Sequence, residues 1–296
     1  MKNVAPAKDH IFVRSHEPST LLKIKGAYRT FRKAERRIAD FILKNPEEVI
    51  NLSITELAEK SEASESSVVR FCQSLGYRGY YELKISIARE LVVPPQHIYE
   101  EINLNDTVAS IKEKVFQANI LALQDTIKML DNRELKKAVE VIAKAGLVVF
   151  YGMATSAAVA LDSAHKFLRI NFNAVSYSDS HMQAISAALL KKGDVAIGIS
   201  HSGSSKEVVE ALRIARQGGA TTICITHHIK SPITKVVDIK FYTAARESTL
   251  RTDAMTSRIA QLSILDVLYV SVALKRYEES LRSIEQTNGA LADKKF

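Results

Sequence analysis

Apolar positions along the chain follow two patterns, and the change from one to the other falls near Gly146. Before that point they recur three and four residues apart, which is typical of amphipathic helices. After it, short β-branched runs alternate with helical stretches, which predicts a parallel sheet between layers of helices. The runs expected to form strands cover residues 147–151, 174–177, 195–199, 221–226 and 239–242. The expected fold class is therefore an all-α N-terminal domain joined to an α/β three-layer (αβα) domain with a five-stranded parallel sheet.

Helix-stopping residues divide the chain further. Residues 1–25 are expected to be loosely ordered, and a helix is expected from Phe31 until Asn45-Pro46 ends its pattern. Two longer helices, over about 107–130 and 133–144, follow the break at Pro94-Pro95. The expected division is a helix-turn-helix domain at residues 1–92, a linker with a connecting helix at 93–130, the α/β domain at 131–277 and a C-terminal tail at 278–296.

A helix-turn-helix arrangement is predicted between residues 53 and 77. Ser53-Ile54-Thr55-Glu56 has the form of a capping box, in which the serine hydroxyl bonds a first-turn amide and the glutamate reaches back to the cap. This short helix is expected to end near Lys60. After a turn, Ser64 can cap a second helix that Gly76 ends.

The second of these helices has an apolar side and a side of short polar residues. Its inward stripe is expected to be Val68, Phe71, Cys72 and Leu75, and its outward face Ser66, Ser67, Arg70, Gln73 and Ser74. Short leading side chains let a helix enter the major groove, and arginine or glutamine can bond guanine or adenine edges. The candidate DNA-binding residues are Ser64, Ser66, Ser67, Arg70, Gln73 and Lys84. An ordinary three-helix bundle with a polar surface helix is the open alternative.

The charge distribution agrees with a nucleic-acid partner without requiring one. Half of the formal net charge of +8 lies in the first 95 of 296 residues. Seven basic residues fall within fifteen positions, and either phosphate contact or a solvated helix face accounts for them: Lys23, Lys25, Arg29, Arg32, Lys33, Arg36 and Arg37.

The positions of the cysteines and the lengths of the apolar runs indicate the cellular compartment of the protein. Cys72 and Cys224 are far apart within apolar patterns, so neither a disulfide framework nor a thiolate metal site is indicated. The N-terminus has no apolar signal core, and no uninterrupted apolar run reaches the roughly 18 residues of a membrane span. A cytoplasmic location with no membrane partner is expected.

Two loops carry candidate ligand chemistry. Gly152-Met153-Ala154-Thr155-Ser156 follows the first expected strand, and the hydroxyl loop, Ser200 to Ser205, follows the third. In parallel sheets, ligands gather at the carboxyl ends of strands. Gly203, the hydroxyls and the start of a helix near Ser205 suit a phosphate group. The chain lacks the Walker lysine spacing and the GxGxxG fingerprint there, which favours a compact phosphoester over a nucleotide. Taken singly, each loop is also explained as a simple turn.

These residues resemble a known family. The run from Ser53 through Arg70-Phe71-Cys72 to Tyr80, with Leu83-Lys84, resembles the helix-turn-helix of RpiR-type transcriptional regulators. Gly152 to Ser156, the string ISHSGSSKE at 199–207, and Glu247-Ser248 before Ser257-Arg258-Ile259 resemble the sugar isomerase (SIS) domain. The resemblance covers about residues 22 to 277, and the order and separation of its two motifs make the joint match specific.

The resemblance implies five parallel strands between helical layers, dimerisation through the SIS domain and a phosphosugar effector. Ser156, Ser200, Ser202 and Ser205 match the positions that hold the phosphate, Glu247 lies where related enzymes place an acid, and His201 is a pocket-lining candidate. The candidate phosphosugar-binding residues are Thr155, Ser156, Ser200, His201, Ser202, Ser205 and Glu247.

The hypothesis that follows is a DNA-binding transcriptional regulator of carbohydrate metabolism. Its binding to a palindromic operator on double-stranded DNA would be modulated by a sugar-phosphate effector, and it would act as a homo-oligomer, dimer or tetramer, without catalytic residues, cofactor or metal. His227-His228 is a poor metal signal because neighbours in an extended segment point to opposite sides.

Two other functions stay open. One is a sugar-phosphate isomerase with an accessory N-terminal domain, which needs a positioned base; the candidates are Glu247, His165, His181, His201 and His227. The other is a sugar-binding protein whose N-terminal domain docks another protein.

Overall fold

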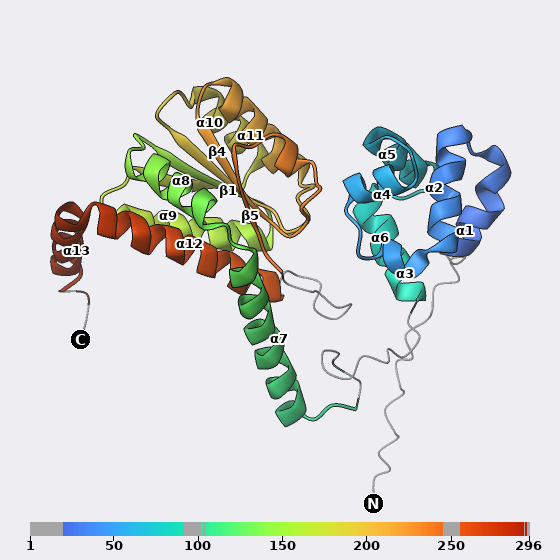
Figure 1. Ribbon diagram of the computed structural model, residues 1–296, viewed down its shortest axis with the longest axis horizontal. Helices are drawn as coiled ribbons and strands as arrows, with labels where there is room; N and C mark the ends of the chain where they lie inside the picture. Colours follow the sequence, from blue (N-terminus) through green and yellow to red (C-terminus); the bar gives the residue numbers. More distant parts are fainter. Residues whose placement is uncertain (1–19, 92–101, 103–104, 245–254, 293, 295–296) are drawn as a thin grey trace, which may run out of the picture.

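Two bodies, each with its own hydrophobic core, make up the computed structural model (Figure 1). The structure describes residues 20–91, 102, 105–244, 255–292 and 294. The boundary expected between residues 92 and 93 lies outside this part of the chain. The helical body is on the right of Figure 1 and the α/β body on the left.

The helical body buries its apolar residues between short helices. Phe31 and Phe71 form its centre, with ring centroids 5.0 Å apart, and Ile38, Leu57 and Leu83 are fully buried around them. Its α-helices are α1 (Thr20–Ala27), α2 (Lys33–Lys44), α3 (Pro46–Val49), α4 (Ile54–Lys60), α5 (Glu65–Ser74) and α6 (Tyr80–Glu90).

Helix α1 corrects one expectation, because the chain is helical from Thr20 and not loosely ordered up to residue 25. Ile24 is fully buried in the core. The Thr20 hydroxyl lies 2.7 Å from the Tyr77 hydroxyl and 2.6 Å from that of Ser86. These partners are more than fifty residues away, so the local pattern could not indicate them.

The α/β body contains one five-stranded parallel sheet in the order β2-β1-β3-β4-β5. The expected strands are confirmed, four of them with both ends as expected and the first displaced by one residue. The agreement is simplest to explain for β1 and β3, which are buried at every position, since a strand covered on both faces is apolar throughout. The strands are β1 (Val148–Gly152), β2 (Ala174–Tyr177), β3 (Val195–Ile199), β4 (Thr221–Thr226) and β5 (Ile239–Tyr242).

Helices cover both faces of this sheet. One core joins the sheet to α8 (Asn132–Ala143), α9 (Thr155–Arg169) and α12 (Met255–Lys275). The core of the opposite face joins it to α10 (Ser180–Leu189) and α11 (Lys206–Gln217). This is the expected three-layer arrangement.

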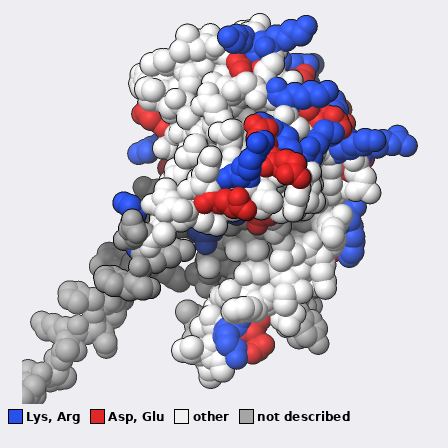
Figure 2. All heavy atoms as spheres, turned by 90° about the vertical axis from the view of Figure 1, so that its left-hand side faces the viewer, with Lys and Arg blue, Asp and Glu red and all other residues white. Residues whose placement is uncertain are grey.

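Two helices extend the α/β body. Helix α7 (Val108–Met129) packs on α12 and projects below the sheet in Figure 1. In the side view of Figure 2, Lys and Arg mix with Asp and Glu over the body, while the projecting part below is mostly neither. Helix α13 (Tyr277–Ala292) occupies most of the expected C-terminal tail, so the described part of that tail is largely helical.

One helix among the described residues, α12, is long and apolar enough to cross a membrane by length and composition. It packs against α7, α8 and α9, and Leu265, Leu268 and Val272 are buried in the core. Asp266 on its outer side accepts a 2.6 Å hydrogen bond from Lys166 of α9. These contacts are those of a core helix of the α/β body.

Candidate functional site

Helix α5 is the second helix of the expected helix-turn-helix pair, and the predicted caps of both helices are present. Ser53 caps α4 with the complete capping box that includes Glu56. Ser64 accepts a 3.2 Å hydrogen bond from the Ser67 amide at the start of α5. Gly76 follows the helix with a φ of +87°, a conformation that favours glycine.

The outward face of α5 is as expected at four of five positions. Ser66, Arg70, Gln73 and Ser74 are exposed, and so is the cap residue Ser64. Ser67 corrects the expectation, because its side chain is only 7% exposed. Its hydroxyl lies 2.9 Å from that of Ser64 and accepts a 3.1 Å hydrogen bond from the Arg70 guanidinium. Ser67 therefore orients Arg70 from within the helix.

Lys84, also a DNA-binding candidate, is half-buried on α6. Its ammonium donates a 2.9 Å hydrogen bond to the Leu52 carbonyl. Its charge also acts on His201 and His228 of the α/β body. This side chain thus lies between the two bodies.

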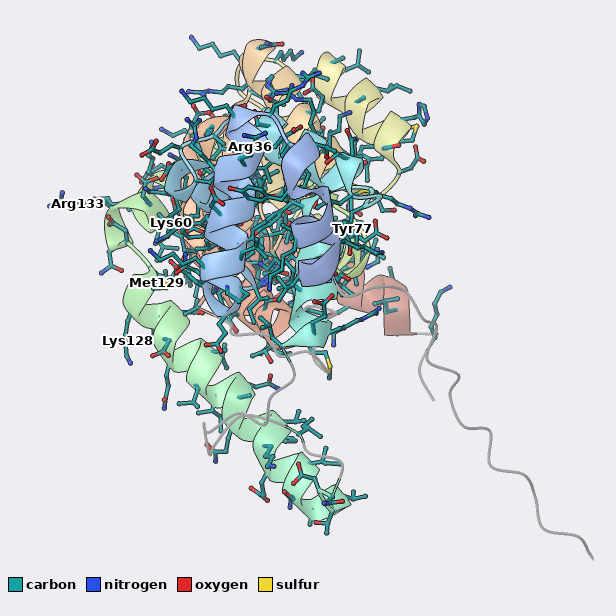
Figure 3. All side chains as sticks on the ribbon, turned by 90° about the vertical axis from the view of Figure 1, so that its right-hand side faces the viewer. Arg36, Lys60, Tyr77, Lys128, Met129 and Arg133 are labelled. Carbon is teal, nitrogen blue, oxygen red and sulfur yellow. The ribbon has the colours of Figure 1, made fainter. Side chains whose placement is uncertain are left out.

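Several members of the basic cluster in α1 and α2 bond the protein itself. Arg36, labelled on α2 in Figure 3, donates a 2.9 Å hydrogen bond to the Phe31 carbonyl. Arg37 donates to the Glu62 carbonyl in the turn between α4 and α5, and Lys23 lies 5.5 Å above the Tyr77 ring. These contacts position the helices. They are neither the phosphate contacts nor the solvated helix face that the sequence led us to expect.

The two candidate ligand loops are neighbours in space. Gly152 at the end of β1 pairs in register with Ile199 at the end of β3. The loop after each strand therefore begins at the same point of the sheet edge. The strand order reverses between β1 and β3, and such a switch point is where doubly wound sheets bind ligands.

The hydroxyl loop is folded around Gly203, whose φ is +63°. The hydroxyls of Ser200 and Ser205 lie 3.0 Å apart, and the Ser202 hydroxyl accepts a 3.2 Å hydrogen bond from the Ser204 amide. Ser205 occupies the cap position of α11, and its side chain makes no cap hydrogen bond. An anion at this helix start would meet backbone amides and the positive end of the helix dipole.

The loop after β1 is tightly wound at the start of α9. Ala154 has a φ of +48°, which an alanine rarely adopts. A side chain at Gly152 would clash with the Ser156 carbonyl. Ser156 is buried, and Thr155 is half-buried beside it. Strain of this kind persists only where surrounding contacts hold it, and it concentrates at ligand-binding loops.

Three histidines meet beside the hydroxyl loop. The His201 and His227 rings stack with centroids 5.1 Å apart, and His228 lies 4.9 Å from His227. Burial, with the adjacent His227, His228 and Lys84, lowers the pKa of His201 to about 3. Burial, with Lys84 and His227, also lowers the pKa of His228 to about 3. Both rings are therefore neutral at physiological pH.

The other base candidates do not join this group. His165 on α9 and His181 on α10 are exposed. Glu247 lies outside the described residues. Among the described residues, no group of three or more His, Cys, Asp or Glu side chains is arranged to hold a metal ion.

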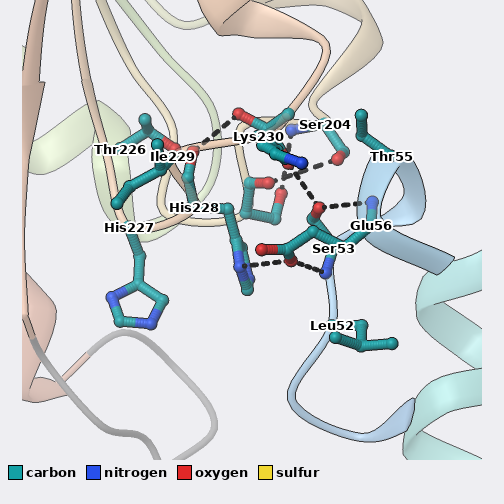
Figure 4. A network of polar contacts seen from close by, with 12 residues as sticks. Leu52, Ser53, Thr55, Glu56, Ser204, Thr226, His227, His228, Ile229 and Lys230 are labelled. Atoms are coloured by element: carbon teal, nitrogen blue, oxygen red, sulfur yellow. Dashed lines mark hydrogen bonds and ion pairs between the residues drawn. The ribbon is translucent and has the colours of Figure 1, made fainter. Parts of the chain in front are cut away.

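The helical body contacts the α/β body at residues 227–235, within the segment between β4 and β5; Figure 4 shows the part of this contact around His228 and Lys230. Lys230 Nζ lies 2.6 Å from Glu59 Oε2, and its carbonyl accepts a hydrogen bond from the Ser53 hydroxyl. Lys235 Nζ lies 2.8 Å from Glu65 Oε1. His228 Nδ1 lies 3.5 Å from Glu56 Oε2. No signal in the sequence relates these residues, since about 170 positions separate the partners.

A helix-turn-helix with a polar second helix, joined to a parallel α/β domain with a hydroxyl-rich loop at its switch point, is typical of DNA-binding proteins that carry a ligand domain. Comparison with known protein families supports this class. The helix-turn-helix domain of the rpiR family matches residues 19–93, and the SIS domain matches residues 141–271.

The chain is also similar to whole proteins of this architecture. It is 42% identical to an HTH-type transcriptional regulator of Caldanaerobacter subterraneus over 276 residues, which are 93% of this chain and 98% of the relative. It is 36% identical to the HTH-type transcriptional regulator YbbH of Bacillus subtilis, over 87% of this chain and 92% of YbbH. The protein belongs to the RpiR family of HTH-type transcriptional regulators with a SIS domain.

A solved structure supports the arrangement of both domains. NanR of Vibrio vulnificus, complexed with ManNAc-6P, superposes with a TM-score of 0.78 at 29% sequence identity. The match covers 93% of this chain and 99% of NanR. The similarity therefore includes the helical domain and the SIS domain together.

Proposed function

We propose that this regulator controls genes of carbohydrate metabolism and that a phosphosugar bound at the carboxyl edge of the SIS sheet modulates its operator binding. The observation that carries the proposal is the hydroxyl loop. Ser200, Ser202 and Ser205 converge there on the start of α11, beside the strained loop of Thr155 and Ser156. The complex of NanR with ManNAc-6P supports the same class of effector.

The chemistry of the hydroxyl loop suits a phosphate monoester. Ser200 and Ser205 bond each other at 3.0 Å, and each hydroxyl can turn to donate to an anion instead. Hydrogen bonds to a charged oxygen are roughly twice as strong as those between neutral groups. The phosphate would thus provide affinity, and the sugar hydroxyls would provide selectivity. Glu247 remains a proposed contact for the sugar.

We propose that the SIS domain binds its ligand without converting it. Isomerisation of a sugar phosphate needs a base whose pKa lies near the working pH. The pKa of about 3 for His201 and His228 makes both rings poor bases at pH 7. A pocket-lining role for His201 agrees with this, and we expect no turnover of aldose or ketose phosphates.

On the DNA side, we propose that Ser64, Ser66, Arg70 and Gln73 contact the operator. All four are exposed: Ser64 caps α5, and Ser66, Arg70 and Gln73 recur at helical spacing along it. Ser67 would act through Arg70, to which it is bonded, and Lys84 would act through its position between the domains. We propose a cytoplasmic location, because the DNA partner is there.

A palindromic operator requires two recognition helices, and we propose that SIS domains pair to supply them. Leu161 and Leu168 of α9 are 49% and 59% exposed, and Val270 and Leu274 of the adjacent α12 are 51% and 63% exposed. Large apolar side chains exposed on two packed helices support a subunit interface there. Sedimentation of the wild type and of Leu168→Arg would measure whether this face joins two or four copies.

The deciding experiment is a thermal-shift screen of the full chain against sugar phosphates and their unphosphorylated sugars. A ligand that binds only the folded state raises the midpoint by mass action. We expect stabilisation by one or more phosphosugars and none by the free sugars. Stabilisation by the free sugars as well would contradict the phosphate cradle, and turnover in a coupled assay would favour the isomerase.

A further inference from the structure

The segment of residues 227–235 touches the hydroxyl loop on one side. The His227 amide donates a 2.9 Å hydrogen bond to the His201 carbonyl, and the Ile233 amide donates one of 2.9 Å to the Gly203 carbonyl. Ser231 packs so closely on Gly203 that a side chain at Gly203 would clash with the Ser231 hydroxyl. The hydroxyl loop and this segment are therefore in direct contact.

On its other side the same segment holds the helix-turn-helix domain. Lys230 and Lys235 pair with Glu59 and Glu65 at 2.6 and 2.8 Å. Ser53, which is 3% exposed, bonds the Lys230 carbonyl. The basic side chains thus come from the SIS domain and the acidic ones from α4 and α5, so the two surfaces are complementary in charge.

One of these contacts reaches the recognition helix itself. Glu65 is the first residue of α5. Burial raises its pKa, but hydrogen bonds from Lys235 and Thr55 outweigh burial and lower the pKa below the usual value. Ser66, Arg70 and Gln73 stay exposed while this pair is formed. The contact therefore leaves these candidate side chains accessible while it joins the first residue of α5 to the SIS domain.

We propose that the 227–235 segment is the docking surface of the helix-turn-helix domain in its own chain, and that it transmits occupancy of the hydroxyl loop to the recognition helix. The transmission half rests on the proposed function, whereas the docking half does not. Exposed ion pairs contribute little stability because water and salt screen them. A docked position held largely by such pairs is one that a bound ligand can shift.

Zero-length carbodiimide coupling of the full chain tests the docking half. It joins a lysine to a glutamate only when they are in contact, and mass spectrometry then identifies the bonded peptides. We expect Lys230 joined to Glu59 and Lys235 joined to Glu65 within one chain, which a mixture of isotope-labelled and unlabelled protein distinguishes from links between chains. Absence of both links, or links only between chains, would overturn docking in the same chain.

Charge reversal provides a second test that needs neither DNA nor effector. Lys230→Glu should reduce the coupling of Lys235 to Glu65 by about fivefold, and combining it with Glu59→Lys should restore the yield. Lys192→Glu is the matched control, because this exposed lysine lies in the turn before β3. A Lys230→Glu variant that couples Lys235 to Glu65 as the control does would contradict a shared docking surface.

The transmission half is tested by repeating the coupling with ManNAc-6P and with inorganic phosphate, after thermal shift has shown which of them binds. We expect the binding probe to change the yield of both links by about fivefold, within the usual range of allosteric coupling. Unchanged yields with a bound probe would overturn transmission. Failure of every sugar phosphate to bind would instead contradict the proposed effector, and the coupling in the free protein would still decide docking.

Discussion

The two domains assemble their functional surfaces in different ways. On α5, candidate residues from Ser64 to Gln73 come from ten consecutive positions, and their mutual hydrogen bonds are local. The candidate phosphosugar site joins loops at Gly152 and Ile199, which meet because β1 and β3 pair in parallel. A surface of the first kind depends on helix capping and one apolar stripe. A surface of the second kind depends on the whole sheet.

The largest expected effect is a loss of stability in one domain that leaves the other domain unchanged. Phe71→Ala removes a fully buried ring that packs on Phe31 in the helical domain. Such a truncation costs about 3–5 kcal/mol. We expect calorimetry to show a lower midpoint for the helical domain and an unchanged midpoint for the SIS domain, with loss of operator binding. A single transition that moves as a whole would mean that the two domains unfold together.

The next effect compares two glycines that both have positive φ. Gly203→Ala should cost about 1–3 kcal/mol from backbone strain, plus the clash with Ser231. Gly76→Ala meets the same kind of strain, but no atom lies within 4 Å of the added carbon. We expect Gly203→Ala to abolish the thermal shift caused by phosphosugars and Gly76→Ala to retain it. Equal retention by both variants would place the effector away from the hydroxyl loop.

A reciprocal pair of substitutions separates the two surfaces directly. Arg70→Ala should weaken operator binding by about 1–3 kcal/mol and leave phosphosugar binding unchanged. Ser202→Ala with Ser205→Ala should weaken phosphosugar binding by about 2 kcal/mol or more and leave the affinity of the effector-free protein for operator unchanged. Fluorescence anisotropy and calorimetric titration measure the two affinities. Wild-type operator affinity of Arg70→Ala would show that α5 does not read the bases through this residue.

The smallest effect concerns pH and the contact between the domains. In the folded chain, the pKa of His201 and His228 is about 3, against 6.5 as the usual value. As pH falls from about 6.5 toward 3, the unfolded chain takes up protons that the folded chain does not, so stability decreases. At pH 5.5 each histidine should cost about 1 kcal/mol. His228 lies 3.5 Å from Glu56 of the helical domain, so the titration of this ring belongs to the contact between the domains.

The check is a denaturant titration at pH 7.5 and 5.5 of the wild type and of His228→Gln. The glutamine variant should lose less stability between the two values than the wild type. An equal loss would mean that other groups dominate the acid sensitivity.

Much of the fold could be predicted from the chain because its signals are local. The capping box at Ser53, the cap at Ser64 and the stop at Gly76 each act within four residues, and the structure contains all three. The strands are short runs rich in β-branched and aromatic residues, and β1 and β3 are buried at every position, so the strand positions could be read directly. Helix α1 was missed because its stabilising partners, Tyr77 and Ser86, are distant in sequence.

The candidate site could be predicted only in part, for the same reason. The hydroxyl loop and the loop after β1 were identifiable from composition and from their place after strands. Ser67 was expected to face outward, but a hydroxyl that bonds both its cap and the next turn packs inward. The roles of Glu59, Glu65, Lys230 and Lys235 had no signal, because their pairs cross the chain between two domains.

By itself, the sequence determined the class of each domain, the caps of the recognition helix and the two loops that carry hydroxyl groups. These features follow from periodicity and from hydrogen bonds between near neighbours, which a local pattern encodes. Only the tertiary structure decided that the loops after β1 and β3 adjoin, that three histidines gather beside them, and that residues 227–235 hold the helix-turn-helix domain. Such contacts join distant parts of the chain, and they form only when the sheet and both cores are complete.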